Sequence, residues 1–232
     1  MRNFQLPGRS PVFARRAAIA TSHPLATQAG LSILKSGGNA VDAAIAACAV
    51  MCVVEPAMTG IGGDCFALYA PKGASKPIAL NGSGKAPAAA TLAKLNELGL
   101  KDEIPLHSPH AVTVPGAIAA WAKLIEDHGS KSFAEILQPA IEFAEQGYVV
   151  HPRVAHDWVN EVEALAADPA SAKNMLVDGK APKAGTIHSQ PLLAETLKKI
   201  AAGGRDAFYK GEVAEDMVAK LNSVGGLHTM DD

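Results

Sequence analysis

Apolar residues recur at helical spacing in the first quarter of the chain. The pattern predicts a helix that begins near Pro24, with Ser22 as its N-cap, and ends at the glycine pair 37–38. Asn39 is the expected N-cap of a second helix, "AVDAAIAACAVMCVVE", and Asp42 adds a negative charge to its first turn. Small or apolar residues cover nearly every face of this second helix, so we expect it to be buried on several sides.

The pattern changes to strand character after residue 58. The segments "CFALYA" and "PIALNG" predict a hairpin that turns at residues 71–73. Further on, "VTVPGAIAAWAKLIEDHG" predicts a short strand followed by an amphipathic helix, and "SFAEILQPAIEFAEQGYVV" predicts two helices separated by Pro139. The last third is mostly helical, apart from a polar surface excursion at 166–190. We therefore predict the α/β (α+β) class and a single helix-rich domain over residues 1–232.

The composition narrows the classes of partner. The chain has 232 residues, of which 48% are hydrophobic and 19% charged, and its net charge of −2 comes without a basic stripe. Without such a stripe we expect no nucleic-acid partner. Because no apolar run reaches membrane-spanning length, we also expect no membrane partner and a cytoplasmic location. The cysteines Cys48, Cys52 and Cys65 are too few for a disulfide framework and form no zinc motif, so buried thiols are the expected interpretation.

Glycine clusters suggest phosphate loops, but their context argues against that function. Gly60, Gly62 and Gly63 follow a helix and precede a strand, which is the reverse of a dinucleotide loop, so a tight turn is favoured. The segment "NGSGK" (81–85) lacks the serine or threonine that follows the lysine in a Walker loop. No cofactor is predicted.

The spacing of the acidic residues and histidines along the chain matches no catalytic or metal-binding motif. Asp64, beside the glycine turn, is predicted to bind its own backbone rather than to act as a general base. His107 and His110 lie three residues apart in a loop, where a surface role or a backbone hydrogen bond is favoured over ligation. No metal site is predicted.

Several phrases together resemble the large subunit of the γ-glutamyltranspeptidase family of N-terminal nucleophile hydrolases, from about residue 17 onward. The phrases are "GGNAVDAAIA", "EPAMTGIGGD", "VTVPGAIAAW", "GGRDAFYKGEVAEDMV" and "GGLHTMDD". The resemblance implies part of an αββα sandwich, made as a precursor that cuts itself once. The new N-terminal threonine of the small subunit would then be the nucleophile, with its own amino group as base. That threonine lies outside residues 1–232, so no catalytic residue is assigned to this chain.

The resemblance also directs attention to residues 81–87. In the family, an arginine that grips the α-carboxylate of the γ-glutamyl group stands where this sequence has Ser83. A guanidinium pairs with a carboxylate through two charge-assisted hydrogen bonds, which one hydroxyl does not replace. Ser83, Gly84 and Lys85 are therefore the predicted substrate-binding residues, at the rim of an acyl pocket altered for a different substrate. A plain turn with no ligand is the alternative.

The segment 81–87 resembles the oxamate-amidohydrolase-like or the cephalosporin-acylase-like branch of the family. These inferences favour the large subunit of a self-processing amidohydrolase that acts on an oxamate-like amide. Genuine γ-glutamyl transfer or glutathione hydrolysis is one alternative, and a non-catalytic ligand-binding relative is another. The expected partners are the small catalytic subunit from the same precursor and a small-molecule amide, and a dimer of such heterodimers is one possible assembly.

Overall fold

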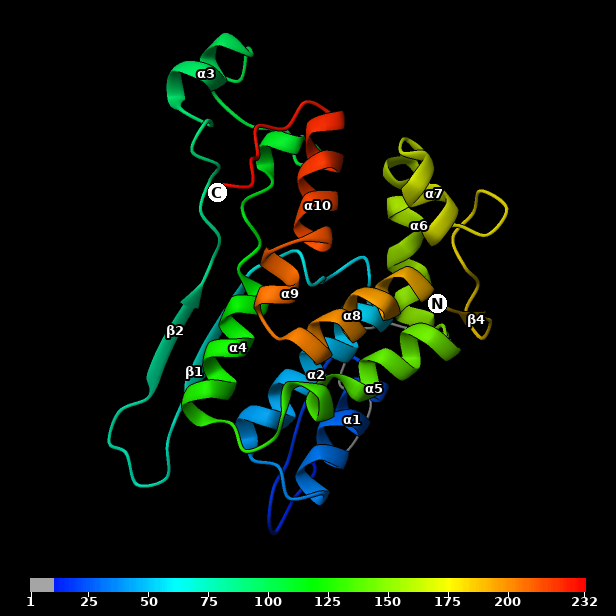
Figure 1. Ribbon diagram of the computed structural model, residues 1–232. Helices are drawn as coiled ribbons and strands as arrows, with labels where there is room; N and C mark the ends of the chain where they lie inside the picture. Colours follow the sequence, from blue (N-terminus) through cyan, green and yellow to red (C-terminus); the bar gives the residue numbers. More distant parts are fainter. Residues whose placement is uncertain (1–10) are drawn as a thin grey trace. The chain divides into compact units, whose positions relative to one another are not determined.

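The computed structural model describes residues 11–232, which form two compact units. Unit 1 comprises the residues up to Met58 together with Pro139–Ala194, and unit 2 comprises Thr59–Gln138 together with Glu195–Asp232. Helices α5 (Phe133–Gln146) and α8 (Pro191–Gly203) contribute residues to both units (Figure 1). Neither unit is one continuous piece of chain, so the single domain expected from the sequence stays a prediction. The helix-rich α+β class is confirmed.

Unit 1 is built around two packed helices, α1 (Pro24–Lys35) and α2 (Ala40–Val54). Their close approach depends on small residues, because a Cβ atom at Gly30 would lie 3.0 Å from the carbonyl oxygen of Ala43. Helix α2 is buried along most of its length, as the sequence predicts. This packing removes its apolar side chains from water, which is the main driving force for folding.

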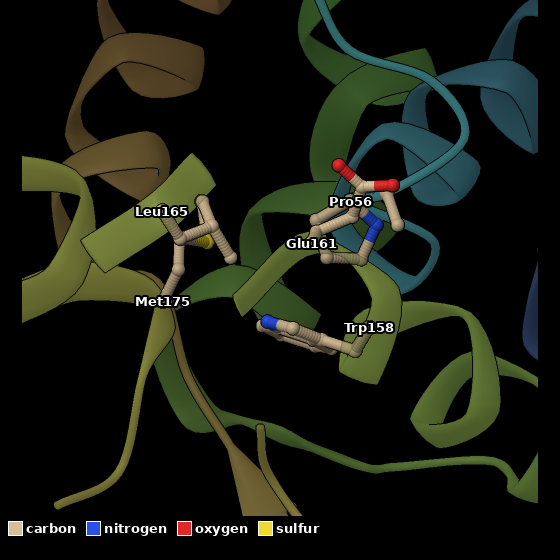
Figure 2. Close-up of a pocket in the computed structure, with 6 residues that line it drawn as sticks. Pro56, Trp158, Glu161, Leu165 and Met175 are labelled. Atoms are coloured by element: carbon tan, nitrogen blue, oxygen red, sulfur yellow. The ribbon is translucent and has the colours of Figure 1, made fainter. Parts of the chain in front are cut away.

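The second half of unit 1 contains α6 (Pro152–Ala166), α7 (Pro169–Met175) and the short antiparallel pair β3 (Tyr148–Val149) and β4 (Ile187–His188). Its largest fully buried side chain is Trp158 on α6, which is 1% exposed. A small hollow opens beside this indole (Figure 2). The region 166–190, predicted to be a surface excursion, thus includes a helix and a strand.

The N-cap of α1 differs from the prediction. His23, not Ser22, occupies the cap, and its Nδ1 accepts a hydrogen bond from the backbone N–H of Leu25 at 3.2 Å. The Ser22 hydroxyl instead donates to the Glu55 carboxylate at 2.7 Å. A distant acceptor therefore takes the hydroxyl that the local pattern assigns to the cap.

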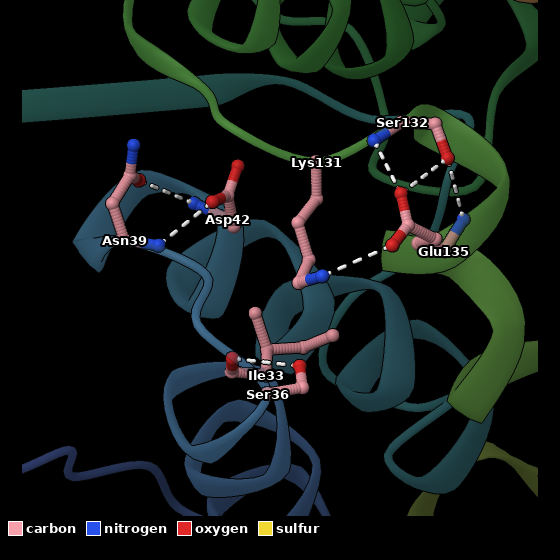
Figure 3. A network of polar contacts seen from close by, with 7 residues as sticks. All are labelled: Ile33, Ser36, Asn39, Asp42, Lys131, Ser132 and Glu135. Carbon is pink, nitrogen blue, oxygen red and sulfur yellow. Dashed lines mark hydrogen bonds and ion pairs between the residues drawn. The ribbon is translucent and has the colours of Figure 1, made fainter.

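Capping boxes begin α2 and α5 (Figure 3). In unit 1, the Asn39 side chain accepts from the N–H of Asp42 at 3.1 Å, and the Asp42 carboxylate accepts from the N–H of Asn39 at 2.7 Å. In unit 2, Ser132 and Glu135 exchange the equivalent bonds, and Lys131 lies 3.0 Å from the Glu135 carboxylate. These bonds hold the pKa of Glu135 down at about 2, chiefly through the Ser132 backbone N–H. The predicted cap at Asn39 is confirmed.

Unit 2 contains the predicted hairpin. Strands β1 (Cys65–Tyr69) and β2 (Ile78–Gly82) pair antiparallel, with Cys65 opposite Gly82, and α4 (Ala117–His128) packs against both strands (Figure 1). The remaining helices of this unit are α3 (Leu92–Glu97), the 3-10 turn η1 (Pro109–Ala111), α9 (Asp206–Tyr209) and α10 (Glu212–Ser223).

Two predicted elements are wrong in detail. The "VTV" segment (112–114) is not a strand; its Val114 N–H donates to the Lys85 carbonyl in a single backbone contact at 2.9 Å. Helix α5 continues through Pro139 instead of stopping there. Ile136 and Leu137 before the proline and Ala140, Ile141 and Ala144 after it are almost completely buried, and this burial exceeds the roughly 3 kcal/mol that an interior proline costs. Within residues 11–232, no helix has the length and apolar character needed to cross a membrane.

Candidate functional site

A groove of about 910 Å³ opens within unit 2. Its walls come from the turn before β1, the loop after β2, the segment that leads into α4, helices α9 and α10, and residues 228–232. The predicted substrate-binding residues Ser83, Gly84 and Lys85 all line this groove, and Ser83 and Lys85 are exposed. The structure thus brings them together in one cavity, while their binding role stays a prediction.

The loop after β2 is held by side-chain oxygens. The N–H of Ser83 donates to the Asn81 side chain at 3.0 Å, and the N–H of Gly84 donates to the Asp64 carboxylate at 2.9 Å. The prediction that Asp64 binds its own backbone is therefore wrong, because its partner Gly84 lies in the loop after β2. Asp64 fixes the rim at the residue that follows Ser83.

Close backbone crossings explain two glycines in this wall. A Cβ atom at Gly84 would lie 1.7 Å from the Val114 carbonyl oxygen, and one at Gly116 would lie 2.1 Å from the Gly82 carbonyl oxygen. Neither space admits a side chain of any size, since real Cβ contacts essentially never fall below 3.0 Å. The groove wall is consequently a layer of backbone, and its shape depends on glycine at both positions.

The glycine turn 60–63 borders the groove through Gly62. The N–H of Gly63 donates to the Gly60 carbonyl at 3.2 Å, as expected for the predicted tight turn. The Gly63 carbonyl accepts from the N–H groups of Gly116 and Ala117 at 3.0 and 2.9 Å. Two of the unpaired donors at the start of α4 are thereby satisfied by backbone.

Tyr209 joins α9 to the start of α4. Its hydroxyl donates to the Pro115 carbonyl at 2.6 Å and accepts from the N–H of Ala119 at 3.1 Å. Burial raises the pKa of Tyr209, so this phenol stays a neutral donor. The Arg205 guanidinium lies 5.2 Å from the centre of the same ring, which places a cation on the groove wall.

Asp232 connects the last residues to the loop after β2. One carboxylate oxygen accepts from the N–H of Ala88 at 2.7 Å, and the other accepts from the N–H and hydroxyl of Thr229 at 2.8 and 3.1 Å. These bonds, led by the one from Ala88, lower the pKa of Asp232. Thr229 and Asp232 therefore form a local turn that also holds the loop after β2.

Three polar side chains that line the groove are Ser83, Lys85 and His228. Lys85 has no ion-pair partner within residues 11–232, and the Ser83 hydroxyl has no hydrogen bond to a base among them. His228 is 4% exposed, and neither of its ring nitrogens has a hydrogen-bond partner in the described part of the chain. A cation and a hydroxyl on the rim suit recognition of a small anionic or amide group.

The remaining candidate residues from the sequence do not line the groove. His107 is exposed, and His110 is partly buried in η1. Of the two thiols on α2, Cys52 is buried as predicted, whereas Cys48 is exposed, contrary to the prediction. No group of three or more histidine, cysteine or acidic side chains within the described residues is placed to hold a metal ion.

Sequence reasoning missed Tyr209, Arg205 and His228 as groove residues. Each reaches the groove from a helix or turn more than a hundred residues away from Ser83. Only Asp64 and the glycines carried a local signal, because they stand in a turn-forming cluster.

Comparison with known proteins gives consistent matches. The sequence model of a family described as Gamma-glutamyltranspeptidase matches residues 26–232. The chain is 37% identical over 222 residues to the "Glutathione hydrolase-like YwrD proenzyme" of Bacillus subtilis (strain 168), which covers 95% of this chain and 42% of that protein. It is 37% identical over 216 residues to the "Oxamate amidohydrolase proenzyme" of Klebsiella pneumoniae, covering 90% of this chain and 40% of that protein. The chain thus spans well under half the length of these relatives.

Solved structures agree with the sequence matches. A cephalosporin acylase from Bacillus halodurans superposes with a TM-score of 0.86 at 39% identity, covering 97% of this chain and 44% of that chain. A gamma-glutamyltranspeptidase from Helicobacter pylori superposes with a TM-score of 0.87 at 31% identity, covering 96% of this chain and 64% of that chain.

Proposed function

Because this chain belongs to the gamma-glutamyltranspeptidase family, we propose that it is the large-subunit portion of a self-cleaving amide hydrolase. The proposal places the threonine nucleophile outside residues 1–232, on a small subunit cut from the same precursor. The relatives named proenzymes support this arrangement. This chain supplies the acyl-binding rim, and the partner supplies the reacting atoms.

The rim at Ser83–Lys85 is the observation that carries the substrate assignment. Ser83 stands where the family resemblance implies an arginine, and it lines the groove together with Gly84 and Lys85. A γ-glutamyl α-carboxylate loses its bidentate partner at such a rim, which costs about 2–5 kcal/mol of binding when the pair is desolvated. Lys85 still offers one point charge, which suits a compact carboxylate beside an amide.

We therefore propose an oxamate-like amide as the preferred substrate. In such a molecule the carboxylate is directly attached to the scissile amide, so a single cation at the rim orients the carbonyl carbon. The relative named oxamate amidohydrolase supports this choice. Glutathione hydrolysis is the second candidate, and it is supported by the 32% identity over 225 residues with the "Glutathione hydrolase proenzyme" of Escherichia coli (strain K12).

The test is a comparison of kcat/KM for oxamate and for a γ-glutamyl anilide, with the precursor carrying this chain expressed whole. Lys85→Ala should lower kcat/KM for oxamate about tenfold or more, because a charge-assisted contact is lost. Ser83→Arg should raise activity toward the γ-glutamyl compound. Lys72→Ala, in the hairpin turn outside the groove, is the matched control.

Several results would contradict the proposal. Equal kcat/KM for Lys85→Ala and Lys72→Ala would mean that Lys85 does not bind the substrate. Better hydrolysis of the γ-glutamyl compound by the unaltered protein would favour the second candidate. Intact mass and N-terminal sequencing of the purified protein separate both from a non-catalytic relative, which would show no threonine-initiated second chain.

A further inference from the structure

A second hollow lies in unit 1, and the proposed function makes no use of it. It has a volume of about 150 Å³, and its lining residues are Pro56, Ala57, Trp158, Glu161, Leu165 and Met175. Five of these are apolar or aromatic, and Glu161 is the charged one. Figure 2 shows the Trp158 indole, with Leu165 and Met175 on one side of the view and Glu161 and Pro56 on the other. An aromatic ring, a thioether and a carboxylate therefore share one small space.

The sequence of α6 explains why these groups meet. Trp158, Glu161 and Leu165 are separated by three and four residues, so they project from the same face of the helix. Met175, the last residue of α7, and the Pro56-Ala57 pair that follows α2 close the remaining sides. All of these residues belong to unit 1.

The indole is held in a fixed orientation. Its ring contacts the His188 imidazole edge to face, with the ring centres 4.9 Å apart, and Trp158 is almost fully buried. Burial lowers the pKa of His188, so the imidazole beside the indole is neutral near pH 7 and adds no positive charge to the hollow. A fixed aromatic wall needs no ordering when a ligand enters.

The charges of α6 favour a cation. Asp157 on this helix is paired with Arg153 at 2.7 Å, whereas Glu161 has no ion-pair partner within residues 11–232. Glu163, on the same helix, is exposed and outside the hollow. An anion in the hollow would be repelled by the Glu161 carboxylate. A neutral molecule would leave this carboxylate without a counter-charge.

We propose that this hollow binds a small organic ammonium ion. The ammonium group pairs with the Glu161 carboxylate, and the alkyl part packs on Leu165, the polarisable Met175 sulfur and the small part of the Trp158 ring that borders the hollow. An apolar cavity of about 150 Å³ accommodates benzene, so the ligand has about six non-hydrogen atoms. The hollow shares no lining residue with the groove at Ser83–Lys85, so this proposal does not depend on the substrate assignment.

The experiment follows the indole N–H signals of ¹⁵N-labelled protein at constant ionic strength. Trp158→Phe identifies the Trp158 signal by its disappearance, and the Trp121 signal serves as the internal control. The probes are butylammonium, 1-butanol and butanoate, which share an alkyl chain and differ in charge. Butylammonium should shift the Trp158 signal saturably, with a Kd on the order of 1 mM, and the other two probes should bind at least roughly tenfold more weakly.

Two carboxylate variants complete the test. Glu161→Gln should weaken butylammonium binding roughly tenfold or more, because the counter-charge is lost. Glu163→Gln removes the same charge from the same helix outside the hollow and should change the Kd less than twofold. Equal binding of butanol and butylammonium, equal effects of the two variants, or the absence of a saturable Trp158 shift would each overturn the proposal.

Discussion

The crossing of Gly84 with residue 114 gives the sharpest stability prediction. In Gly84→Ala, the new Cβ would lie 1.7 Å from the Val114 carbonyl oxygen, whereas ordinary contact begins at 3.4 Å. The two backbone segments must therefore separate by about 1.7 Å. Such a shift breaks the Val114 to Lys85 backbone bond and the bond from Gly84 to the Asp64 carboxylate, both 2.9 Å long.

The energy follows from these broken contacts. A neutral backbone hydrogen bond contributes about 1 kcal/mol net, and a bond to a charged group about 1.5–3 kcal/mol. With the strain of overpacking added, Gly84→Ala should lower the free energy of unfolding by about 3–5 kcal/mol. Because the same shift moves Ser83 and Lys85, the variant should also lose activity in the assembled protein.

The assay is urea unfolding followed by circular dichroism, with Gly62→Ala as the matched control. Gly62 lines the same groove, but a Cβ there meets no atom within 4 Å. The control should stay within about 0.5 kcal/mol of the unaltered protein. If Gly84→Ala were as stable as Gly62→Ala, the backbone crossing described above would be refuted.

Three further predictions concern single side chains. His23 is 2% exposed, and burial together with the nearby His151 lowers its pKa from 6.5 to about 4. The unfolded chain therefore takes up a proton at a higher pH than the folded protein does. As a result, the free energy of unfolding should fall by up to about 3 kcal/mol as the pH drops from 6.5 to 4. His23→Asn keeps a capping residue without a titrating ring, so pH-dependent unfolding should show a smaller loss over this range, and an unchanged loss would contradict the assignment. Tyr209→Phe should cost about 1–3 kcal/mol in urea unfolding, because the Pro115 carbonyl and the Ala119 N–H lose their partner; a change below 0.5 kcal/mol would mean that water replaces the hydroxyl. Asn39→Ala should cost about 1 kcal/mol by removing the cap of α2, and Asn39→Gly, measured in parallel, only a few tenths.

The helices and the hairpin were predictable because short-range interactions determine them. The cap at Asn39 and the hairpin from β1 to β2 each depend on residues close to one another along the chain. Such interactions are encoded in the spacing of residues, so one sequence suffices to find them. The family resemblance rests on the same phrases.

The failures share a different cause. The Ser22 hydroxyl bonds to Glu55, 33 positions away, and this leaves the cap of α1 to His23. Asp64 bonds to Gly84, 20 positions away, instead of to its own turn. Helix α5 passes through Pro139 because burial of its apolar face outweighs the local cost of the proline.

By itself, the sequence determined helices α1 and α2, the hairpin, the family and the choice of Ser83, Gly84 and Lys85 as candidate residues. Only the tertiary structure decided that these residues line a groove with Tyr209 and His228, and that Trp158 and Glu161 share a hollow with Met175. The physical reason is that many donors, acceptors and apolar faces along a chain are equivalent by local rules. Packing selects among them, because each buried polar group takes whichever partner the fold brings within reach.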